Sequence, residues 1–121
     1  AKVADYYQTL HEDFVARKRE IIQKFTPLIN IGLISFEIPE YNKIVAAYID
    51  GWLYLAIAQG KTLMLCNSFQ APDFTTAEYF VFLAMKKLQL NPEMSSIYFR
   101  TPLAEEQEMS LYRYFRSVEH I

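Results

Sequence analysis

Three short apolar runs, separated by turn residues, dominate the middle of the chain and predict β-strands. The first run, residues 43–49, is rich in β-forming side chains and ends at Asp50-Gly51, which is a strong hairpin signal. The second, residues 52–58, ends at a turn in which Gly60 can adopt a positive φ, and the third covers residues 62–69. The pattern therefore predicts a three-stranded antiparallel meander. Because polar residues barely alternate with apolar ones, we expect both faces of these strands to be at least partly covered, as happens when helices pack on both sides of a sheet.

Helical periodicity marks the first forty residues. Apolar residues fall at turn-related spacings over residues 6–25, and the apolar period continues over residues 28–36. Thr26-Pro27 lies between these stretches, and a proline inside a helix removes a hydrogen bond and clashes with the preceding turn. We therefore predict two helices joined near Pro27, with Pro39 ending the second.

Another helical stretch follows the meander and is apolar almost all round. Its body is residues 79–85, which predicts a largely buried central helix. Two start signals precede it, because Thr75 and Glu78 have the spacing of a capping box and Asp73 offers a second cap just upstream. We expect this helix to stop before Asn91-Pro92.

The last part of the chain predicts two more strands and one helix. Ser96–Phe99 reads as a strand that returns parallel to the first. Thr101-Pro102 resembles an N-cap followed by proline at the first helical position, with three glutamates early in that helix and Arg113 and Arg116 late, as the macrodipole favours. Residues 117–121 predict a strand at the edge of the sheet.

The order β-β-β-α-β-α-β, preceded by helices, is the element order of a ribonuclease-H-like or actin-like ATPase half-domain, an α/β layered sandwich. With 121 residues, 52% of them hydrophobic, the chain has the size of one domain. We expect residues 1–40 to form a helical segment that packs on the sheet and residues 41–121 to form the core. The chain begins at Ala1 rather than Met, so we expect it to belong to a longer protein of two halves.

Charge and cysteine content narrow the expected surroundings. Twelve Lys and Arg against fourteen Asp and Glu give a net charge of −2, which provides no field to attract nucleic acid or an anionic membrane, and we predict neither partner. The single Cys66 has no intrachain disulfide partner, fits a reducing compartment and is predicted to be buried and inert. No apolar run approaches the roughly 20 residues that span a bilayer. We therefore expect a cytoplasmic protein.

Four motifs occur in one order along the chain: residues 50–55, residues 65–69, residues 78–80 and residues 112–115. Together they resemble the uncharacterised bacterial family known as domain of unknown function 3822, and the resemblance covers roughly residues 26–121. It implies an actin-like ATPase fold, in which two ribonuclease-H-like halves face a cleft, and this chain would be the C-terminal half. The resemblance also implies a bacterial, cytoplasmic protein whose first partner is its own other half-domain.

The resemblance to the wider actin-like superfamily indicates where a nucleotide would bind. There, an Asp followed by several Gly and Thr residues closes around the phosphates between the first two strands, and the Asp holds metal-bound water. Here that loop is only Asp50-Gly51, followed by bulky Trp52, and the place of the adenosine-side glycine-rich loop is taken by residues 100–102. We therefore expect no cofactor, with ATP and magnesium as the alternative.

The candidate cofactor-binding residues are Asp50, Gly51, Asn67 and Ser68, of which Asp50 is also the candidate metal ligand. In the actin-like arrangement Asn67-Ser68 would face the cleft between the halves. A simpler interpretation is that Asp50 and Asn67 are turn residues and Ser68 is a local cap.

Other chemistries lack their residues. A ribonuclease-H-type nuclease needs several carboxylates around two metal ions; Asp50 and Glu78 are two candidates, but the strand at residues 97–99 adds none. His11 and His120 lie near opposite ends and have no spacing typical of a zinc site. Ser68 has no glycine elbow. We predict no catalytic residue, and whether the protein is an enzyme stays open.

Two hypotheses for the function follow. The first is a non-catalytic actin-like scaffold or protein-interaction module with degenerate nucleotide loops, which binds a protein partner or forms a homodimer. The second is a weak ATP-binding or ATP-hydrolysing member of the superfamily that needs the other half-domain. Nine Tyr and nine Phe exceed what a small core hides, so we expect an interface to use some of five tyrosines: Tyr41, Tyr48, Tyr54, Tyr112 and Tyr114.

Overall fold

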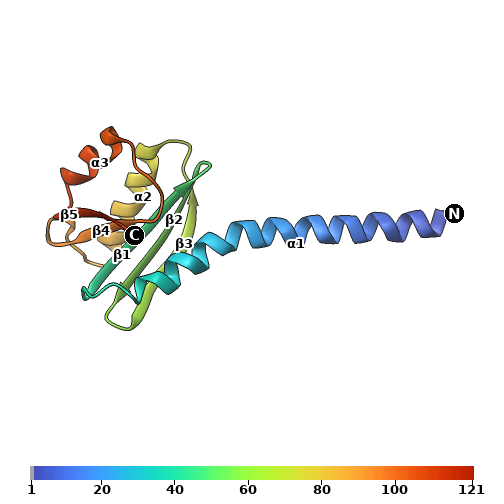
Figure 1. The fold of residues 1–121 in the computed structure, drawn as a ribbon, viewed down its shortest axis with the longest axis horizontal. Coiled ribbons are helices and arrows are strands. Elements are labelled where there is room, and N and C mark those ends of the chain that lie inside the picture. Colours follow the sequence, from blue (N-terminus) through green and yellow to red (C-terminus); the bar gives the residue numbers. More distant parts are fainter. Residues whose placement is uncertain (1) are drawn as a thin grey trace.

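A five-stranded mixed sheet with helices on both faces forms the body of the molecule (Figure 1). The computed structural model describes the backbone of residues 2–121 and the side chains of all of these except residues 2–4, 6 and 20–25. The strand order is β3-β2-β1-β4-β5. The elements along the chain are α1 (Lys2–Ser35), β1 (Asn42–Ile49), β2 (Trp52–Gln59), β3 (Thr62–Gln70), α2 (Phe74–Lys87), the 3₁₀ turn η1 (Pro92–Met94), β4 (Ser96–Phe99), α3 (Glu105–Tyr112) and β5 (Ser117–His120).

The predicted antiparallel meander is confirmed. β1 pairs with β2 so that Ile49 faces Trp52, which leaves a two-residue turn between the strands. Both turn residues have positive φ, 49° at Asp50 and 76° at Gly51, as a type I′ hairpin requires. β2 then pairs antiparallel with β3 after a turn in which Gly60 has φ 59°.

The predicted parallel return is also confirmed. β4 lies beside β1, with Ile97 opposite Ile44, and β5 lies parallel to β4 as the edge strand. Pairing of the β1 and β4 backbones continues past the strand end, because the Arg100 N–H donates to the Ala46 carbonyl at 2.9 Å. The α/β class and the order of strands and α-helices from β1 onward therefore match the prediction made from the sequence.

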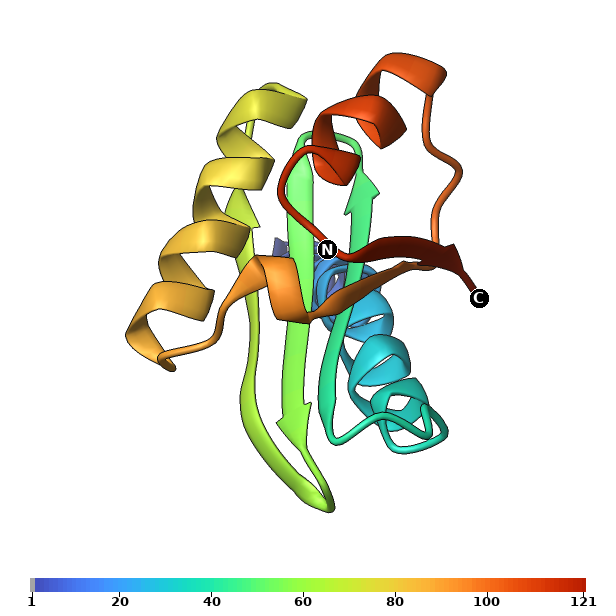
Figure 2. The same cartoon turned by 90° about the vertical axis from the view of Figure 1, so that its left-hand side faces the viewer.

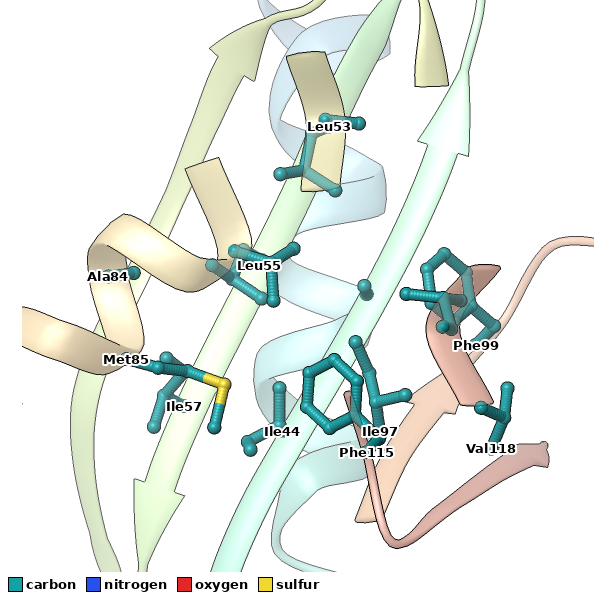
Figure 3. Close-up of a cluster of buried hydrophobic side chains, with 14 of the residues drawn as sticks. Ile44, Leu53, Leu55, Ile57, Ala84, Met85, Ile97, Phe99, Phe115 and Val118 are labelled. Carbon is teal, nitrogen blue, oxygen red and sulfur yellow. The ribbon is translucent and has the colours of Figure 1, made fainter. Parts of the chain in front are cut away.

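Each face of the sheet has its own apolar core. On one face α2 and α3 cover the strands (Figure 2). The buried side chains of this core come from both helices and from every strand except β3, and Figure 3 shows those of β1, β2, α2, β4 and β5. On the other face the C-terminal part of α1 packs on β1 and β2 through Ile31, next to Val45 and Tyr54. Both faces of β1 and β2 are thus buried, as predicted. The prediction that both faces are at least partly covered also holds for β3, where Leu65 and Phe69 pack on one core and Cys66 on the other, although this edge strand leaves Leu63 41% and Met64 44% exposed.

The N-terminal helices form one continuous helix, so the predicted break near Pro27 is wrong. α1 runs through Pro27 to Ser35 and is about 50 Å long. Beyond Pro27 the helix lies on the sheet, where Leu28, Ile31 and Ile34 contact apolar strand residues, and this packing offsets the hydrogen bond that proline cannot donate. The N-terminal part projects away from the body of the molecule (Figure 1).

The helix start signals were partly misread. α2 begins at Phe74, and Asp73 is its cap, since its Oδ1 accepts from the Thr76 N–H at 2.7 Å; the predicted capping box of Thr75 and Glu78 is wrong. α3 begins only at Glu105, where the Gln107 side chain accepts from the Ala104 N–H at 2.9 Å. The three early glutamates of α3 are in its first turn, as predicted, but the helix ends before both arginines, Arg113 and Arg116.

Candidate functional site

The turn between β1 and β2 is fixed by the segment that follows β3. The Ala71 N–H donates to the Gly51 carbonyl at 2.8 Å, and the Tyr48 hydroxyl donates to the Ala71 carbonyl at 2.7 Å. A turn of two residues offers at most two backbone N–H groups to a ligand. Cradling a chain of phosphates takes a longer loop with several N–H groups directed at the anion. Asp50 and Gly51 therefore act as turn residues in this geometry.

Trp52 follows this turn directly and begins β2. Its side chain is partly buried and packs against the apolar cluster under α1, which includes Tyr54 and Ile31. The bulky residue next to the turn is thus part of the core of the domain.

A cavity lies at the carboxyl ends of the parallel strands β1 and β4, the edge at which open α/β sheets usually bind ligands. Its volume is about 350 Å³. The Thr101 Oγ1 accepts a hydrogen bond from the Tyr48 N–H at 3.0 Å. This threonine therefore binds the backbone of β1, and Ala104 is the N-cap residue of α3. Arg100 is exposed at the rim. The lining combines four polar and four apolar residues: Thr26, Asn30, Arg100, Thr101, Pro27, Ile31, Ala47 and Ile49.

The four candidate residues do not form one site. Asn67 faces Leu55 and lies three ladder positions from the pair of Trp52 with Gln70 next to the turn, which is about 10 Å along the strand. Asn67 and Ser68 are consecutive in β3, so their side chains point to opposite faces of the sheet. Asp50 and Gly51 share the turn, whereas Asn67 lines a different cavity, between β3 and α2.

Glu78, the second candidate nuclease carboxylate, faces α3. Its Oε2 accepts from the Ser110 hydroxyl at 3.1 Å. Burial raises the pKa of the Glu78 carboxyl, while the hydrogen bond from Ser110 and the charge of Arg113 act in the opposite direction. In the part of the chain that the structure describes, no group of three or more His, Cys, Asp and Glu side chains could hold a metal ion.

The two histidines and the cysteine have separate surroundings. His120 lies 3.4 Å from Glu108 at the surface, while His11 is exposed on the projecting part of α1. Cys66 is partly buried rather than fully buried as predicted, and its Sγ lies 3.4 Å from the Leu28 carbonyl of α1. Burial raises the pKa of the Cys66 thiol, which keeps it protonated and a poor nucleophile.

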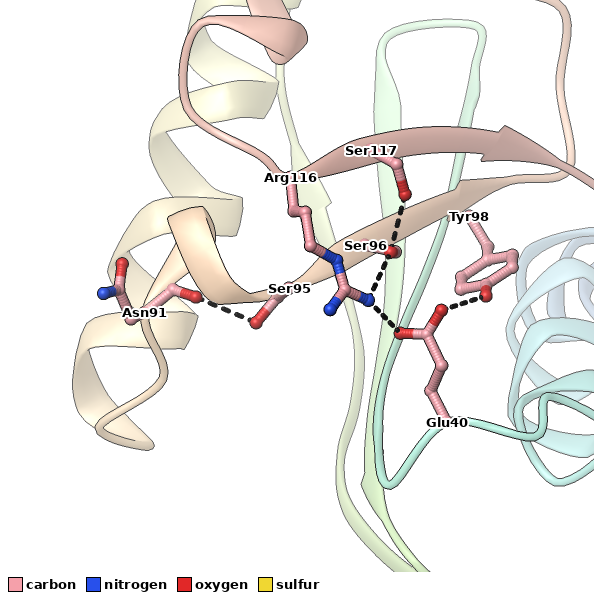
Figure 4. Close-up of polar contacts among 7 residues, drawn as sticks. All are labelled: Glu40, Asn91, Ser95, Ser96, Tyr98, Arg116 and Ser117. Carbon is pink, nitrogen blue, oxygen red and sulfur yellow. Dashed lines mark hydrogen bonds and ion pairs between the residues drawn. The ribbon is translucent and has the colours of Figure 1, made fainter.

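A polar network that the sequence did not reveal lies at the amino ends of β4 and β5 (Figure 4). The Tyr98 hydroxyl donates to Glu40 Oε1 at 2.7 Å, and Arg116 Nη2 lies 3.4 Å from Glu40 Oε2 and donates to the Ser96 hydroxyl at 3.2 Å. The Ser117 hydroxyl donates to the same Ser96 oxygen at 2.6 Å.

This network lies at the opposite end of β4 from Arg100. Burial, then the hydrogen bond and charge of Glu40, raise the pKa of Tyr98 to about 12. Glu40 and Arg116 are 76 positions apart in the chain, so no local pattern could have paired them. We interpret the network as a tie between the segment before β1 and the start of β5.

Sheet order, strand directions and helix placement define a ribonuclease-H-like half-domain of the actin-like class. A Bacteroides thetaiotaomicron protein with an actin-like ATPase fold and unknown function superposes with a TM-score of 0.65 at 17% sequence identity, over 78% of this chain and 37% of that chain. Residues 4–118 match the family described as "Protein of unknown function (DUF3822)", and the chain belongs to this family. The predicted resemblance is confirmed and reaches further toward the N-terminus than its motifs did. No curated protein matches the chain.

This chain spans little more than a third of the structurally similar Bacteroides protein. At this identity the similarity shows the fold alone. In the described part of the chain, no helix is both long enough and apolar enough to cross a membrane.

Proposed function

We propose that this chain is one half of a cytoplasmic bacterial actin-like protein and acts as a non-catalytic scaffold or protein-interaction module. One observation carries the proposal. The connection between β1 and β2, where the resemblance places a phosphate loop, is a two-residue type I′ turn tied to Ala71. A nucleotide at this position would lack the ring of N–H donors that a phosphate chain requires.

The other half-domain of the same polypeptide is the first proposed partner. The similar Bacteroides protein is much longer than the matched segment, which supports a second half outside residues 1–121. Three of the five tyrosines expected at an interface are exposed, Tyr41, Tyr112 and Tyr114, while Tyr54 is buried and Tyr48 is partly buried. Amphipathic aromatics of this kind are common where proteins meet.

A thermal-shift titration with ATP and magnesium tests the proposal. Saturating a site at about 100 times its dissociation constant adds roughly 2.7 kcal/mol of stability, so binding at millimolar nucleotide would raise the melting temperature clearly. We expect no shift for the wild-type full-length protein, which contains both halves. A shift that disappears in Asp50→Asn, which keeps a residue suited to positive φ but removes the charge, would overturn the proposal.

The second candidate function is weak ATP binding that needs the other half-domain. The cavity at the carboxyl ends of β1 and β4 favours it, because Arg100 could face a phosphate there and Thr101 could contribute its hydroxyl. In this case ATP would shift the melting temperature of the full-length protein, in wild type and in Asp50→Asn but not in Arg100→Ala. A matched change of an exposed arginine elsewhere, Arg113→Ala, should leave the shift intact.

A further inference from the structure

β3 presents a free edge with unusual composition. It is the outermost strand of the sheet and has nine residues, Thr62–Gln70, without a charged residue or proline. Natural proteins usually protect such an edge with lysines, prolines or a covering element, because unpaired N–H and C=O groups recruit another strand. Two apolar side chains, Leu63 and Met64, are exposed at one end of it.

The backbone N–H of Ser68 shows which side of β3 is the free edge. The Ser68 N–H donates to its neighbour's side chain, Asn67 Oδ1, at 2.8 Å, so it points away from β2. Backbone N–H groups alternate in direction along a strand, which places the N–H groups of Cys66 and Gln70 on the same free side. A side chain that turns away would release the Ser68 donor to an incoming strand.

An apolar groove runs beside this edge. Its volume is about 170 Å³, and Leu65 and Phe69 of β3 line it together with Phe80 and Leu83 of α2. The rings of Phe69 and Phe80 stack at 4.9 Å with 16° between their planes. A strand paired with β3 would direct every second side chain toward α2, and this groove would receive it.

The groove has a positive charge at one end. Among the residues that the structure describes, no Asp or Glu lines the groove, and Lys87 lies at one end of it. Lys86 and Lys87 are exposed and form no ion pair or side-chain hydrogen bond within the described residues. α2 runs back along β3 from Phe80, so Lys87 lies toward Leu65 (Figure 2). An antiparallel partner strand would end beside Lys87.

We infer that β3 and the groove beside α2 bind an extended segment of a separate protein, which adds as an antiparallel strand. The segment has apolar residues at alternate positions and an acidic side chain or terminal carboxylate at the end that lies over Lys87. The inference names a partner chemistry for the interaction role proposed above and rests on it.

The test selects binders from a phage-displayed library of short random peptides on the 121-residue chain and measures the affinity of a synthesised winner by fluorescence anisotropy. We expect alternating apolar residues followed by an acidic one. Ser68→Pro removes an N–H that faces the free edge, and Leu83→Arg places a charge in the groove; each should weaken binding by about tenfold or more. Lys87→Glu should weaken the binding of acidic peptides and strengthen the binding of versions in which Lys replaces the acidic residue.

Two matched controls separate the edge from the surface in general. Ser68→Ala keeps the N–H, and Met109→Arg changes an exposed apolar residue on α3, so both should bind as wild type does. The inference is overturned if selection on the wild-type chain enriches no peptide beyond those that selection on Leu83→Arg also enriches. It is overturned as well if the selected peptide binds all variants with equal affinity. Sedimentation of the chain alone tests whether a second copy of the chain binds the edge instead. A dimer that is lost in Ser68→Pro would overturn the inference, because the partner would then be another copy of this chain. Addition of ATP should change none of these affinities, so a nucleotide response would contradict only the proposed function.

Discussion

At the scale of single residues, side chains distant in sequence decide the local chemistry. Tyr98, Glu40 and Arg116 come from three segments and form one hydrogen-bonded network. The ion pair between Arg116 and Glu40 is largely exposed, so it adds little stability by itself. Within this network the pKa of the Tyr98 phenol is raised, because burial and the carboxylate of Glu40 disfavour loss of its proton.

Ionisation of Tyr98 should be visible at alkaline pH. Its pKa is raised from 10.0 to about 12 in the folded protein, so the folded state retains a proton that the unfolded state loses. The stability that this proton contributes is fully present below the unfolded value and is lost as the pH rises through about 12. Tyr98→Phe should remove the latest step of the ultraviolet tyrosinate titration, and Glu40→Gln should move that step to lower pH. Loss of an earlier step in Tyr98→Phe would contradict this prediction.

Gly32 and Cys66 are coupled across the interface of α1 and β3. A Cβ on Gly32 would lie 3.3 Å from Cys66 Sγ, closer than an ordinary contact. Ala is favoured over Gly inside a helix by about 1 kcal/mol. We expect Gly32→Ala to gain less stability in the wild-type background than in the Cys66→Ala background, where the sulfur is absent. Urea unfolding of the wild type, the two single variants and the double variant measures both gains. Equal gains in both backgrounds would show that the sulfur moves aside freely.

At the scale of the elements, the types and order were predictable but their ends depended on which side chain made the cap. Two residues near the start of α2 had suitable side chains, and only the structure shows that Asp73 accepts the Thr76 N–H. Thr101 likewise had the features of a cap, yet its hydroxyl accepts from Tyr48 of a neighbouring strand.

Replacing the true cap of α2 should be distinguishable from replacing the false one. Asp73→Ala should lower the melting temperature by several degrees, and Thr75→Ala should change it little. Hydrogen bonds from Thr76 lower the pKa of Asp73, so its contribution is present above the ordinary value of 3.8 and is lost as the pH falls through the lowered one. The deficit of Asp73→Ala should therefore shrink in acid. An equal deficit in Thr75→Ala would mean that both residues serve the helix start.

At the scale of the whole molecule, α1 has two unlike parts. Near its end Ile31 is 1% exposed against the sheet, whereas Leu10 is 47% and Phe14 65% exposed on the projecting part. An isolated helix gains little stability without a packed face, so the projecting part depends mainly on its own backbone hydrogen bonds.

Hydrogen exchange should separate these two parts of α1. We expect the amides of residues 5–19 to exchange much faster than those of residues 31–35, which open only when the packing on the sheet is lost. The amides of β1 and β2 serve as the protected reference within the same experiment. Slow exchange over residues 5–19 would show that another surface covers this part of the helix in solution.

The sequence by itself determined the α/β class, the order of elements from β1 onward and the hairpin at Asp50-Gly51, because hydrophobic periodicity and turn residues act over a few neighbouring positions. Asp50-Gly51 needed no tertiary information, since two residues with positive φ suit a tight hairpin. Tertiary structure alone decided that α1 continues through Pro27, that β3 is an exposed edge, and that Asn67 lies apart from Asp50. These outcomes depend on contacts between segments far apart in the chain, whose packing free energy outweighs or redirects local preference.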